Sequence, residues 1–335
     1  MRALIALAGL ALTGCAVQPM RETLLSGQTM GSAWTVKIAG MLPGTADDLR
    51  AGVQSRFDAV NLVLSTYRVD SALSLFNNDD SGEWVAIDPE LGLVLSYALS
   101  LAEDSGGAYD VTVGPLVNLW GFGPDPASRR VPETAALEAA RARVGWRKVE
   151  VDPAMRQARK APGVRVDLSS LGKGRGVDRV ADYLDGQGVA NYLIDLSGKL
   201  RARGVNTRGE TWRVAVEPPT ADATSARPPF PPEVIGLDNE SVATAGDYRR
   251  FFEIDGKHYS HIIDPRTGWP VTHDTVSASA IAADCMQADA LATVLMAMSP
   301  DDALALANRR RLRALLISRN GTEYVARQTG VWTLK

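Results

Sequence analysis

The chain has 335 residues, of which 45% are apolar, so it is long enough for one large domain or two ordinary domains with a real core. Its formal net charge of −3 gives no electrostatic reason to expect nucleic-acid binding. No apolar stretch of the chain is long enough to cross a membrane as a stable helix.

The N-terminus has the pattern of a bacterial lipoprotein signal. One arginine precedes an apolar run over residues 3–12, which is too short to span a bilayer as a stable helix. The run ends in Leu-Thr-Gly-Cys, a sequence that resembles a lipobox with Cys15 as the lipidated residue. We therefore expect a signal peptide over 1–14, a lipidated tether over 15–28 and a folded domain over 29–335. The alternative is an ordinary secretory signal that is cut elsewhere.

Lipidation of Cys15 would determine where the protein is located and which cysteine keeps a free thiol. Several acyl chains would hold the protein to a membrane face, and we expect the periplasmic side of the cell envelope, with the inner membrane favoured. Only Cys285 would then remain as a free thiol, so no internal disulfide would form.

The first half of the chain alternates between helix and strand signals. A strand is predicted over 34–38, and Thr45 is expected to cap a helix that runs to about Leu64. Asp88 and Pro89 begin a second long helix that ends at glycines 106–107. Four weaker signals are a short helical or turn segment over 70–77, a strand-like start leading into a Gly/Pro/aromatic loop over 108–123, a helix over 132–144 and a strand over 146–151.

A possible anion site follows in the middle of the chain. Residues 164–167 are predicted as a strand, residues 168–176 as a glycine-rich turn that carries Lys173, and residues 177–184 as a helix. Free backbone N–H groups and the dipole of a helix N-terminus both favour phosphate. The spacing is neither the P-loop nor the dinucleotide fingerprint, so a plain tight turn is an equal alternative.

The second half is rich in strands. The Pro-rich segment 218–232 is expected to be an exposed loop, because strands resume on both sides of it. Asp255-Gly256 is a hairpin turn signal between strands over 249–254 and 257–262, and a turn is expected at 264–268. The remaining expected elements are strands over 192–195, 200–203, 212–216, 234–237, 241–245 and 275–282, a helix over 301–307, and a closing hairpin over 312–317 and 323–326.

Residues 285–298 read as a buried helix with two polar positions after its first turn, Asp289 and Thr293. They are four residues apart, so they lie on one face of the helix. A buried carboxylate costs several kcal/mol unless it has a partner, for which an arginine from elsewhere or a hard cation would serve. On the helix alone, an arginine is the favoured partner.

Seven segments together resemble the FAD:protein FMN transferases, the ApbE-type flavin transferases. They occur in the family's order and extend from residue 29 to about residue 300. The segments are Thr29-Met30-Gly31, Ser65-Thr66-Tyr67, residues 109–117, residues 166–174, Gly246-Asp247-Tyr248-Arg249, residues 259–268 and residues 288–293. The resemblance implies an α+β fold, a single domain built on antiparallel sheet with packed helices.

The resemblance also implies a binding site for FAD and Mg²⁺. Asp289 and Thr293 would ligate Mg²⁺ together with the backbone carbonyl near Ser170. Met30 and Tyr67 would touch the flavin. The adenine and ribose side would be lined by Ala108, Tyr109 and Asp110, and the pocket would be completed by Asp167, Lys173 and Ile263.

The reaction that the resemblance implies attaches FMN through a phosphoester to a threonine hydroxyl of an acceptor protein and releases AMP. Such a transfer needs in-line positioning and neutralised phosphate charge, which Mg²⁺ on the catalytic Asp289 would assist. We expect His261 to accept the proton of the threonine, since an imidazole titrates near neutral pH. Its alternative role is a structural hydrogen bond in the hairpin. The other two histidines, His258 and His273, are expected at the surface.

Other readings of the same site stay open. Water in place of the threonine would make the protein a Mg²⁺-dependent FAD pyrophosphatase, and loss of the chemistry would leave a flavin-binding lipoprotein. Acceptors of this family present a Ser/Thr-Gly-Ala-Thr-like motif, often in membrane respiratory subunits. Residues 222–225 resemble that motif faintly, which makes self-modification at Thr224 a further hypothesis. Three positions depart from the common pattern: Arg175, the turn over 196–199, and Ala245.

Overall fold

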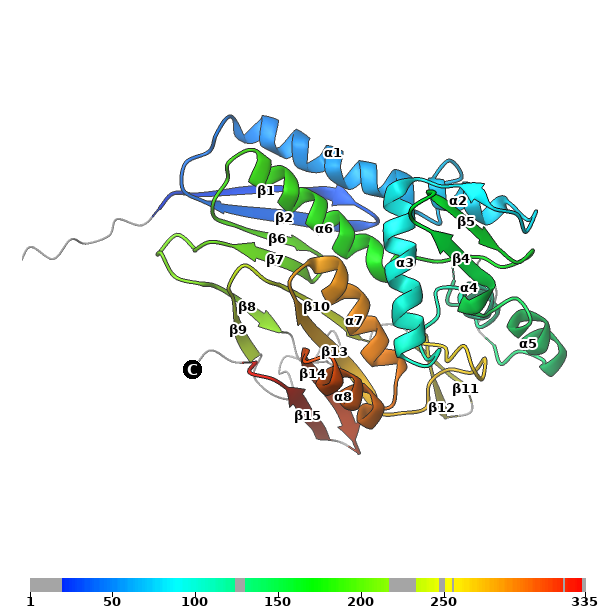
Figure 1. Cartoon of the computed structure of the whole chain (residues 1–335). Coiled ribbons are helices and arrows are strands. Elements are labelled where there is room, and N and C mark those ends of the chain that lie inside the picture. The colour runs from blue at the N-terminus through cyan, green and yellow to red at the C-terminus, as the bar shows by residue number, and fades with distance from the viewer. Residues whose placement is uncertain are drawn as a thin grey trace, which may run out of the picture.

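The computed structural model describes residues 20–123, 130–216, 233–246, 251–254, 256–321 and 323–332. Its centre is an antiparallel eight-stranded sheet with the order β1-β2-β6-β7-β10-β13-β14-β15 (Figure 1). These strands are β1 (Glu22–Thr29), β2 (Ser32–Ala39), β6 (Tyr192–Leu196), β7 (Lys199–Arg203), β10 (Ser241–Gly246), β13 (Thr275–Ala282), β14 (Arg313–Asn320) and β15 (Glu323–Thr329). The fold is thus the predicted single α+β domain on antiparallel sheet.

Helices cover one face of this sheet (Figure 1). They are α1 (Ala46–Leu64), α6 (Ser169–Gly186), α7 (Cys285–Ala297) and α8 (Pro300–Arg309). Helix α1 begins where predicted, because the Thr45 side chain accepts a hydrogen bond from the Asp48 backbone N–H at 3.1 Å. Its predicted apolar face is buried against α6 and β1. Helix α7 lies over β10 and β13, so its apolar length is core.

A hairpin covers the opposite face of the sheet. It consists of β8 (Trp212–Val216) and β9 (Glu233–Leu237), which pair with each other and form a separate two-stranded sheet. Neighbouring residues of β13 point to opposite faces of the sheet. Ala278 and Ala280 belong to the core under α7, whereas Ile281 packs with the hairpin. Both faces of the central strands are therefore buried.

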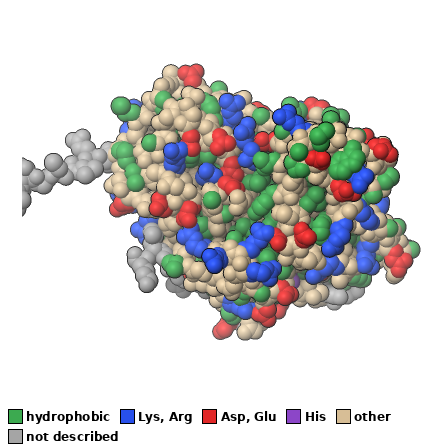
Figure 2. All heavy atoms as spheres, in the orientation of Figure 1, with side chains coloured by type: hydrophobic (Ala, Val, Ile, Leu, Met, Phe, Trp, Pro, Cys, Tyr) green, Lys and Arg blue, Asp and Glu red, His purple; other side chains and the backbone are tan. Residues whose placement is uncertain are grey.

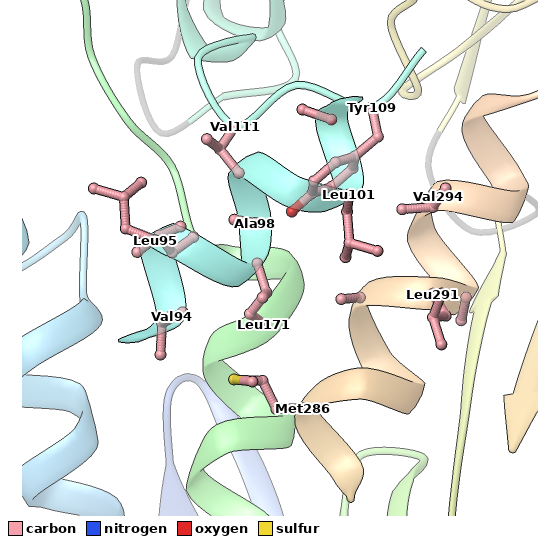
Figure 3. Close-up of a cluster of buried hydrophobic side chains, with 14 of the residues drawn as sticks. Val94, Leu95, Ala98, Leu101, Tyr109, Val111, Leu171, Met286, Leu291 and Val294 are labelled. Carbon is pink, nitrogen blue, oxygen red and sulfur yellow. The ribbon is translucent and has the colours of Figure 1, made fainter. Parts of the chain in front are cut away.

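Helix α3 (Pro89–Asp104) crosses the ends of α6 and α7 and joins them in one core. Figure 3 shows Leu101 of α3, Leu171 of α6 and Val294 of α7 in this buried cluster. Beside this core lie two smaller groups of elements. The first group consists of α2 (Ala72–Asn78), β3 (Val85–Ala86), a short 3₁₀-helix (Trp146–Lys148), β4 (Val149–Asp152) and β5 (Gln157–Lys160). The second group consists of α4 (Gly114–Leu119), α5 (Thr134–Arg141), β11 (Phe251–Ile254) and β12 (Lys257–Ser260).

The prediction of a tether over residues 15–28 is wrong for residues 22–28, which belong to β1. This edge strand pairs with β2 along its full length, from Glu22 opposite Ala39 to Thr29 opposite Ser32. Its Leu25 is buried, and Gly27 lies against the indole of Trp34, so close that a Cβ there would come within 2.6 Å of the ring. The folded domain consequently starts before residue 29. Cys15 and Thr224 lie outside the described residues.

The predicted strand over 164–167 is wrong, because its backbone groups bond elsewhere. The side-chain amide of Asn77 donates to the Val166 carbonyl at 2.8 Å and accepts from the Val166 N–H at 2.7 Å. The Asp167 N–H donates to the carbonyl of Val111. A side chain thus takes the place of a neighbouring strand. The strand-like start predicted at residue 108 is likewise not a strand, and α4 follows it.

The predicted glycine-rich turn over 168–176 is also wrong, because these residues form the first turns of α6. The glycines serve helix packing. A Cβ on Gly174 would lie 2.4 Å from the carbonyl oxygen of Cys285, and one on Gly176 would lie 3.0 Å from Phe57. Close contact between α6, α7 and α1 therefore outweighs the low helix propensity of glycine.

None of the helices within the described part of the chain has the length and apolar character to cross a bilayer. Figure 2 shows acidic and basic side chains interspersed over the visible face, in keeping with the small net charge.

Candidate active site

Two cavities meet where the N-terminus of α6, helix α7 and the segment after β12 come together. The wide cavity has a volume of about 540 Å³ and extends to the ends of α1, β7 and β10. The narrow cavity has a volume of about 190 Å³ and reaches the segment that precedes α4. Both are lined by the same four residues, Ser169, Ser170, His261 and Thr293. These four side chains form a waist between two halves of one elongated site.

The structure places every predicted site residue that it describes in these cavities. The wide cavity is lined by Met30, Tyr67, Lys173 and Asp289, the narrow cavity by Ala108, Tyr109, Asp110, Asp167 and Ile263, and the waist contains Ser170, His261 and Thr293. Met30 and Tyr67, which were expected to touch the flavin, thus lie apart from Ala108, Tyr109 and Asp110, which were expected on the adenosine side. The individual roles of these residues stay predictions.

Asp289 is the buried anion of the site, with 3% of the residue exposed. Its Oδ2 accepts a hydrogen bond from the Gly174 backbone N–H at 3.0 Å, and its Oδ1 lies 3.2 Å from the Nζ of Lys199. Burial raises the pKa of Asp289, and the nearby Lys199 and the Gly174 N–H partly offset that rise. The partner of this carboxylate in the protein is therefore a lysine, where the sequence suggested an arginine or a cation.

The oxygen atoms around Asp289 fit a hard cation. Thr293 is one helical turn further along α7, where its hydroxyl donates to the Asp289 carbonyl at 3.2 Å, and Ser170 of α6 lines the same cavity. Among the described residues no three His, Cys, Asp or Glu side chains gather into a cluster that could hold a metal. Mg²⁺ does not need one, because it takes one or two carboxylates and completes its shell with water and substrate phosphate. The oxygen atoms of Asp289 and Thr293 fit such a set, and Mg²⁺ at this site stays a prediction.

The N-terminus of α6 is held in place from the narrow-cavity side of the waist. Asp167 accepts hydrogen bonds from the backbone N–H and the hydroxyl of Ser169, and the hydroxyls of Tyr109 and Ser170 lie 2.8 Å apart. Burial raises the pKa of Tyr109, so the phenol stays protonated. The positive end of the helix dipole thus points to the waist, where it favours an anion.

Lys173 lies one turn into α6, and its ammonium donates to the Ser32 hydroxyl at 2.9 Å. This contact joins α6, at the wall of the wide cavity, to the start of β2. The turn before β2 is tight, with Met30 and Gly31 both at positive φ (47° and 68°). Met30 is therefore held at the cavity wall by a strained backbone. Tyr67 is 74% exposed at the rim.

Both carboxylate oxygens of Asp110 accept hydrogen bonds from groups of the protein itself. Oδ1 accepts from the N–H and hydroxyl of Thr112 at 2.8 and 2.7 Å, and Oδ2 accepts from the Trp146 N–H at 2.8 Å. Burial raises its pKa despite these hydrogen bonds. Asp110 therefore shapes the segment that lines the narrow cavity, and its backbone and its remaining lone pairs are what a ligand would meet.

The site also contains residues that the sequence reasoning did not select. Lys199, Ser197 and Thr244 line the wide cavity from the ends of β6, β7 and β10. Lys199 stands in the turn region 196–199 that departs from the family pattern, which was a signal that this position differs. The expectation that His273 lies at the surface is wrong, because the residue is half-buried and burial lowers the pKa of its imidazole.

Comparisons with known proteins show the family and agree with the fold. The chain matches the ApbE family over residues 30–316. A protein of Vibrio cholerae named FAD:protein FMN transferase is 41% identical over 316 residues, which cover 94% of this chain and 92% of that protein. A protein of Escherichia coli K12 with the same name is 34% identical over 327 residues, or 95% and 92% of the two chains.

Solved structures give the same result. The flavin transferase ApbE from Vibrio cholerae superposes with a TM-score of 0.85 at 38% identity, covering 93% of this chain and 98% of that one. The flavinyl transferase ApbE from Pseudomonas stutzeri, in its apo form, has a TM-score of 0.84 at 35% identity and covers 93% and 96%.

Proposed function

The chain belongs to the ApbE family, and we propose from this that it transfers FMN from FAD to a threonine hydroxyl of an acceptor protein, with Mg²⁺, and releases AMP. The observation that carries the proposal is the waist formed by Ser169, Ser170, His261 and Thr293 beside Asp289. FAD is two nucleotides joined by a pyrophosphate, so an elongated site with an anion-favouring waist suits it.

FAD would lie with its flavin in the wide cavity and its adenosine in the narrow cavity. The pyrophosphate then falls at the waist, where the N-terminus of α6 meets Thr293 and His261. Met30 and Tyr67 line the flavin side, whereas Ala108, Tyr109 and Ile263 line the adenosine side. Lys173 offers a positive charge next to the waist.

Asp289, Thr293 and the Ser170 carbonyl would hold Mg²⁺. When bound, the ion neutralises charge on the phosphate oxygens. The residues of the chain would position the substrates, since phosphoryl transfer depends on in-line alignment of the attacking and leaving oxygens.

His261 is proposed as the general base. The threonine oxygen of the acceptor bonds to the phosphorus of the FMN half, and the bond from that phosphorus to the bridging oxygen breaks. AMP leaves with the bridging oxygen, and the imidazole of His261 takes the threonine proton. His261 lines both cavities, so it lies next to the phosphorus atoms of an FAD bound across the waist.

The acceptor is proposed to carry a threonine in a Ser/Thr-Gly-Ala-Thr-like motif on a membrane respiratory subunit. The protein would meet it at the periplasmic face of the cell envelope, with the inner membrane favoured, anchored through acylated Cys15. The Leu-Thr-Gly-Cys sequence supports the anchor. Cys15→Ala should release the protein from the membrane fraction, and continued membrane binding of that variant would contradict the anchor.

The test mixes the full chain with FAD, Mg²⁺ and an acceptor domain that carries the threonine motif. A denaturing gel under ultraviolet light detects covalent flavin, and AMP is assayed in parallel. We expect a fluorescent acceptor band that disappears when the acceptor threonine is changed to alanine or when Mg²⁺ is chelated. AMP and free FMN without a band would indicate a pyrophosphatase. Flavin binding with neither product would leave a flavin-binding lipoprotein.

A further inference from the structure

Lys199 is the protein's own cation at the buried carboxylate of the site. It opens β7 directly after the turn at Ser197-Gly198, and its side chain is 14% exposed. Its Nζ lies 3.2 Å from Asp289 Oδ1 and donates to the Thr244 carbonyl at 2.7 Å. The ammonium thus bridges α7 and β10 inside the wide cavity.

Both oxygens of Asp289 are engaged in this arrangement. Oδ2 accepts the Gly174 N–H, and Oδ1 faces the ammonium of Lys199. The Gly174 contact is backbone and is fixed by the packing of α6 on α7. The Lys199 contact is made by a flexible four-carbon side chain. A divalent cation that binds Asp289 therefore has to displace the ammonium, because two cations at one buried oxygen repel each other strongly in a medium of low dielectric constant.

Once displaced, the ammonium of Lys199 can turn to a second anion in the same cavity, the pyrophosphate of FAD. Lys199 and Lys173 both line the space next to the waist, where the proposed function places the pyrophosphate. An ammonium group has three donors, so its bond to the Thr244 carbonyl can persist while the other two turn to a phosphate.

We propose that Lys199 is a phosphate-binding residue of the transfer reaction that exchanges partners: it neutralises Asp289 while the cation is absent and moves to the pyrophosphate of FAD when a divalent cation occupies Asp289. This inference rests on the proposed function, because it needs a cation at Asp289 and a pyrophosphate at the waist. It adds a residue that binds one substrate and competes with the cofactor.

The exchange couples the two ligands. If the divalent cation binds alone, it separates the Lys199 ammonium from Asp289 and leaves that ammonium without an anionic partner. If the cation binds together with FAD, the phosphate of FAD becomes the new partner of Lys199. Each ligand should therefore increase the affinity of the other, and the factor must be the same in both directions. Some coupling arises from direct contact between cation and phosphate, so the contribution of Lys199 is the part that its substitution removes.

The test measures binding without turnover. Mn²⁺ affinity is determined by electron paramagnetic resonance on the full chain, with and without ADP as an unreactive pyrophosphate. ADP affinity is determined by calorimetry with and without Mn²⁺. The variants are Lys199→Met, Lys199→Gln and the charge-retaining Lys199→Arg. Lys37→Met, an exposed lysine of β2, makes the same chemical change outside the cleft.

We expect Lys199→Met and Lys199→Gln to bind Mn²⁺ alone at least about 5-fold more tightly than the wild type, and to bind ADP alone more weakly. Their coupling factor between Mn²⁺ and ADP should fall. Lys199→Arg and Lys37→Met should stay near the wild type in Mn²⁺ affinity. If Lys199→Met does not fold, Lys199→Gln serves in its place as the uncharged variant.

Two contrary outcomes can be told apart with Asp289→Asn. If the wild type binds Mn²⁺ at a site that Asp289→Asn abolishes, but Lys199→Met and Lys199→Gln do not change that affinity, the exchange is wrong and the metal site stands. If no variant shows Mn²⁺ binding that depends on Asp289, the metal site of the proposed function fails, and the exchange fails with it.

Discussion

The backbone N–H of Gly174 donates a hydrogen bond of 3.0 Å to the carboxylate of Asp289, across the contact between α6 and α7. The bond exists because the two helices approach closely, with no side chain at residue 174 to separate them. Helix packing and the orientation of the buried carboxylate are therefore one feature of the molecule.

Gly174→Ala should push the two helices apart and misplace Asp289. Its Cβ would lie 2.4 Å from the carbonyl oxygen of Cys285 and 2.8 Å from the Cα of Met286, both backbone atoms that cannot rotate away. Overpacking of this kind costs about 1–3 kcal/mol. We expect a lower melting temperature and a loss of flavin transfer larger than the loss of stability would explain. Gly186→Ala in the same helix has open space around its Cβ and should be neutral or stabilising.

His261→Gln should lower the rate of flavin transfer by roughly 100- to 10,000-fold, the range for loss of a general base. FAD affinity should change little, because the glutamine still fills the waist. The pH–rate profile measured by acceptor fluorescence should also lose its acidic limb. A variant that loses FAD binding and transfer in equal measure would show a structural role instead.

Tyr109→Phe should raise the KM for FAD a few-fold while kcat stays near the wild-type value. The phenol positions Ser170 at the waist through a 2.8 Å hydrogen bond, and loss of one neutral bond costs about 0.5–1.5 kcal/mol. Tyr192→Phe is the matched control, because it loses a hydrogen bond to Asp185 away from both cavities. An equal change of KM in the two variants would argue against a role for Tyr109 at the site.

His273 should make stability depend on pH. Burial lowers the pKa of its imidazole below the ordinary 6.5, so between these two values the unfolded chain binds more protons than the folded one. Stability is therefore full above pH 6.5 and declines as the pH falls through the lowered pKa. The melting temperature of the wild type should drop between pH 7 and pH 5 more than that of His273→Gln. Parallel curves for the two proteins would contradict this assignment.

Elements that a local signal decides could be predicted from the sequence. Helix α7 was predictable because its long apolar run has two polar residues on one face, and α1 because Thr45 caps an amphipathic stretch. Elements that contacts with distant residues decide could not be predicted. The glycines of α6 look like a turn until Cys285 and Phe57 are known to lie against them, and residues 164–167 look like a strand until Asn77 takes its backbone bonds.

The site divides in the same way. Its residues were found through family segments that are contiguous in sequence, and all of those described lie in the two cavities. Lys199 was not found, because its importance comes from the pairing of β7 with β10 under α7, which brings its ammonium to Asp289. No spacing along the chain indicates that contact.

The most direct test of the account is the ratio of AMP released to flavin bound covalently by the acceptor, measured for the wild type and for Asp289→Asn. We predict one AMP for each flavinylated threonine in the wild type, and neither product in Asp289→Asn, with FAD still able to bind that variant. A large excess of AMP over covalent flavin at saturating acceptor would contradict a transferase. Unchanged transfer in Asp289→Asn would contradict the assignment of the site.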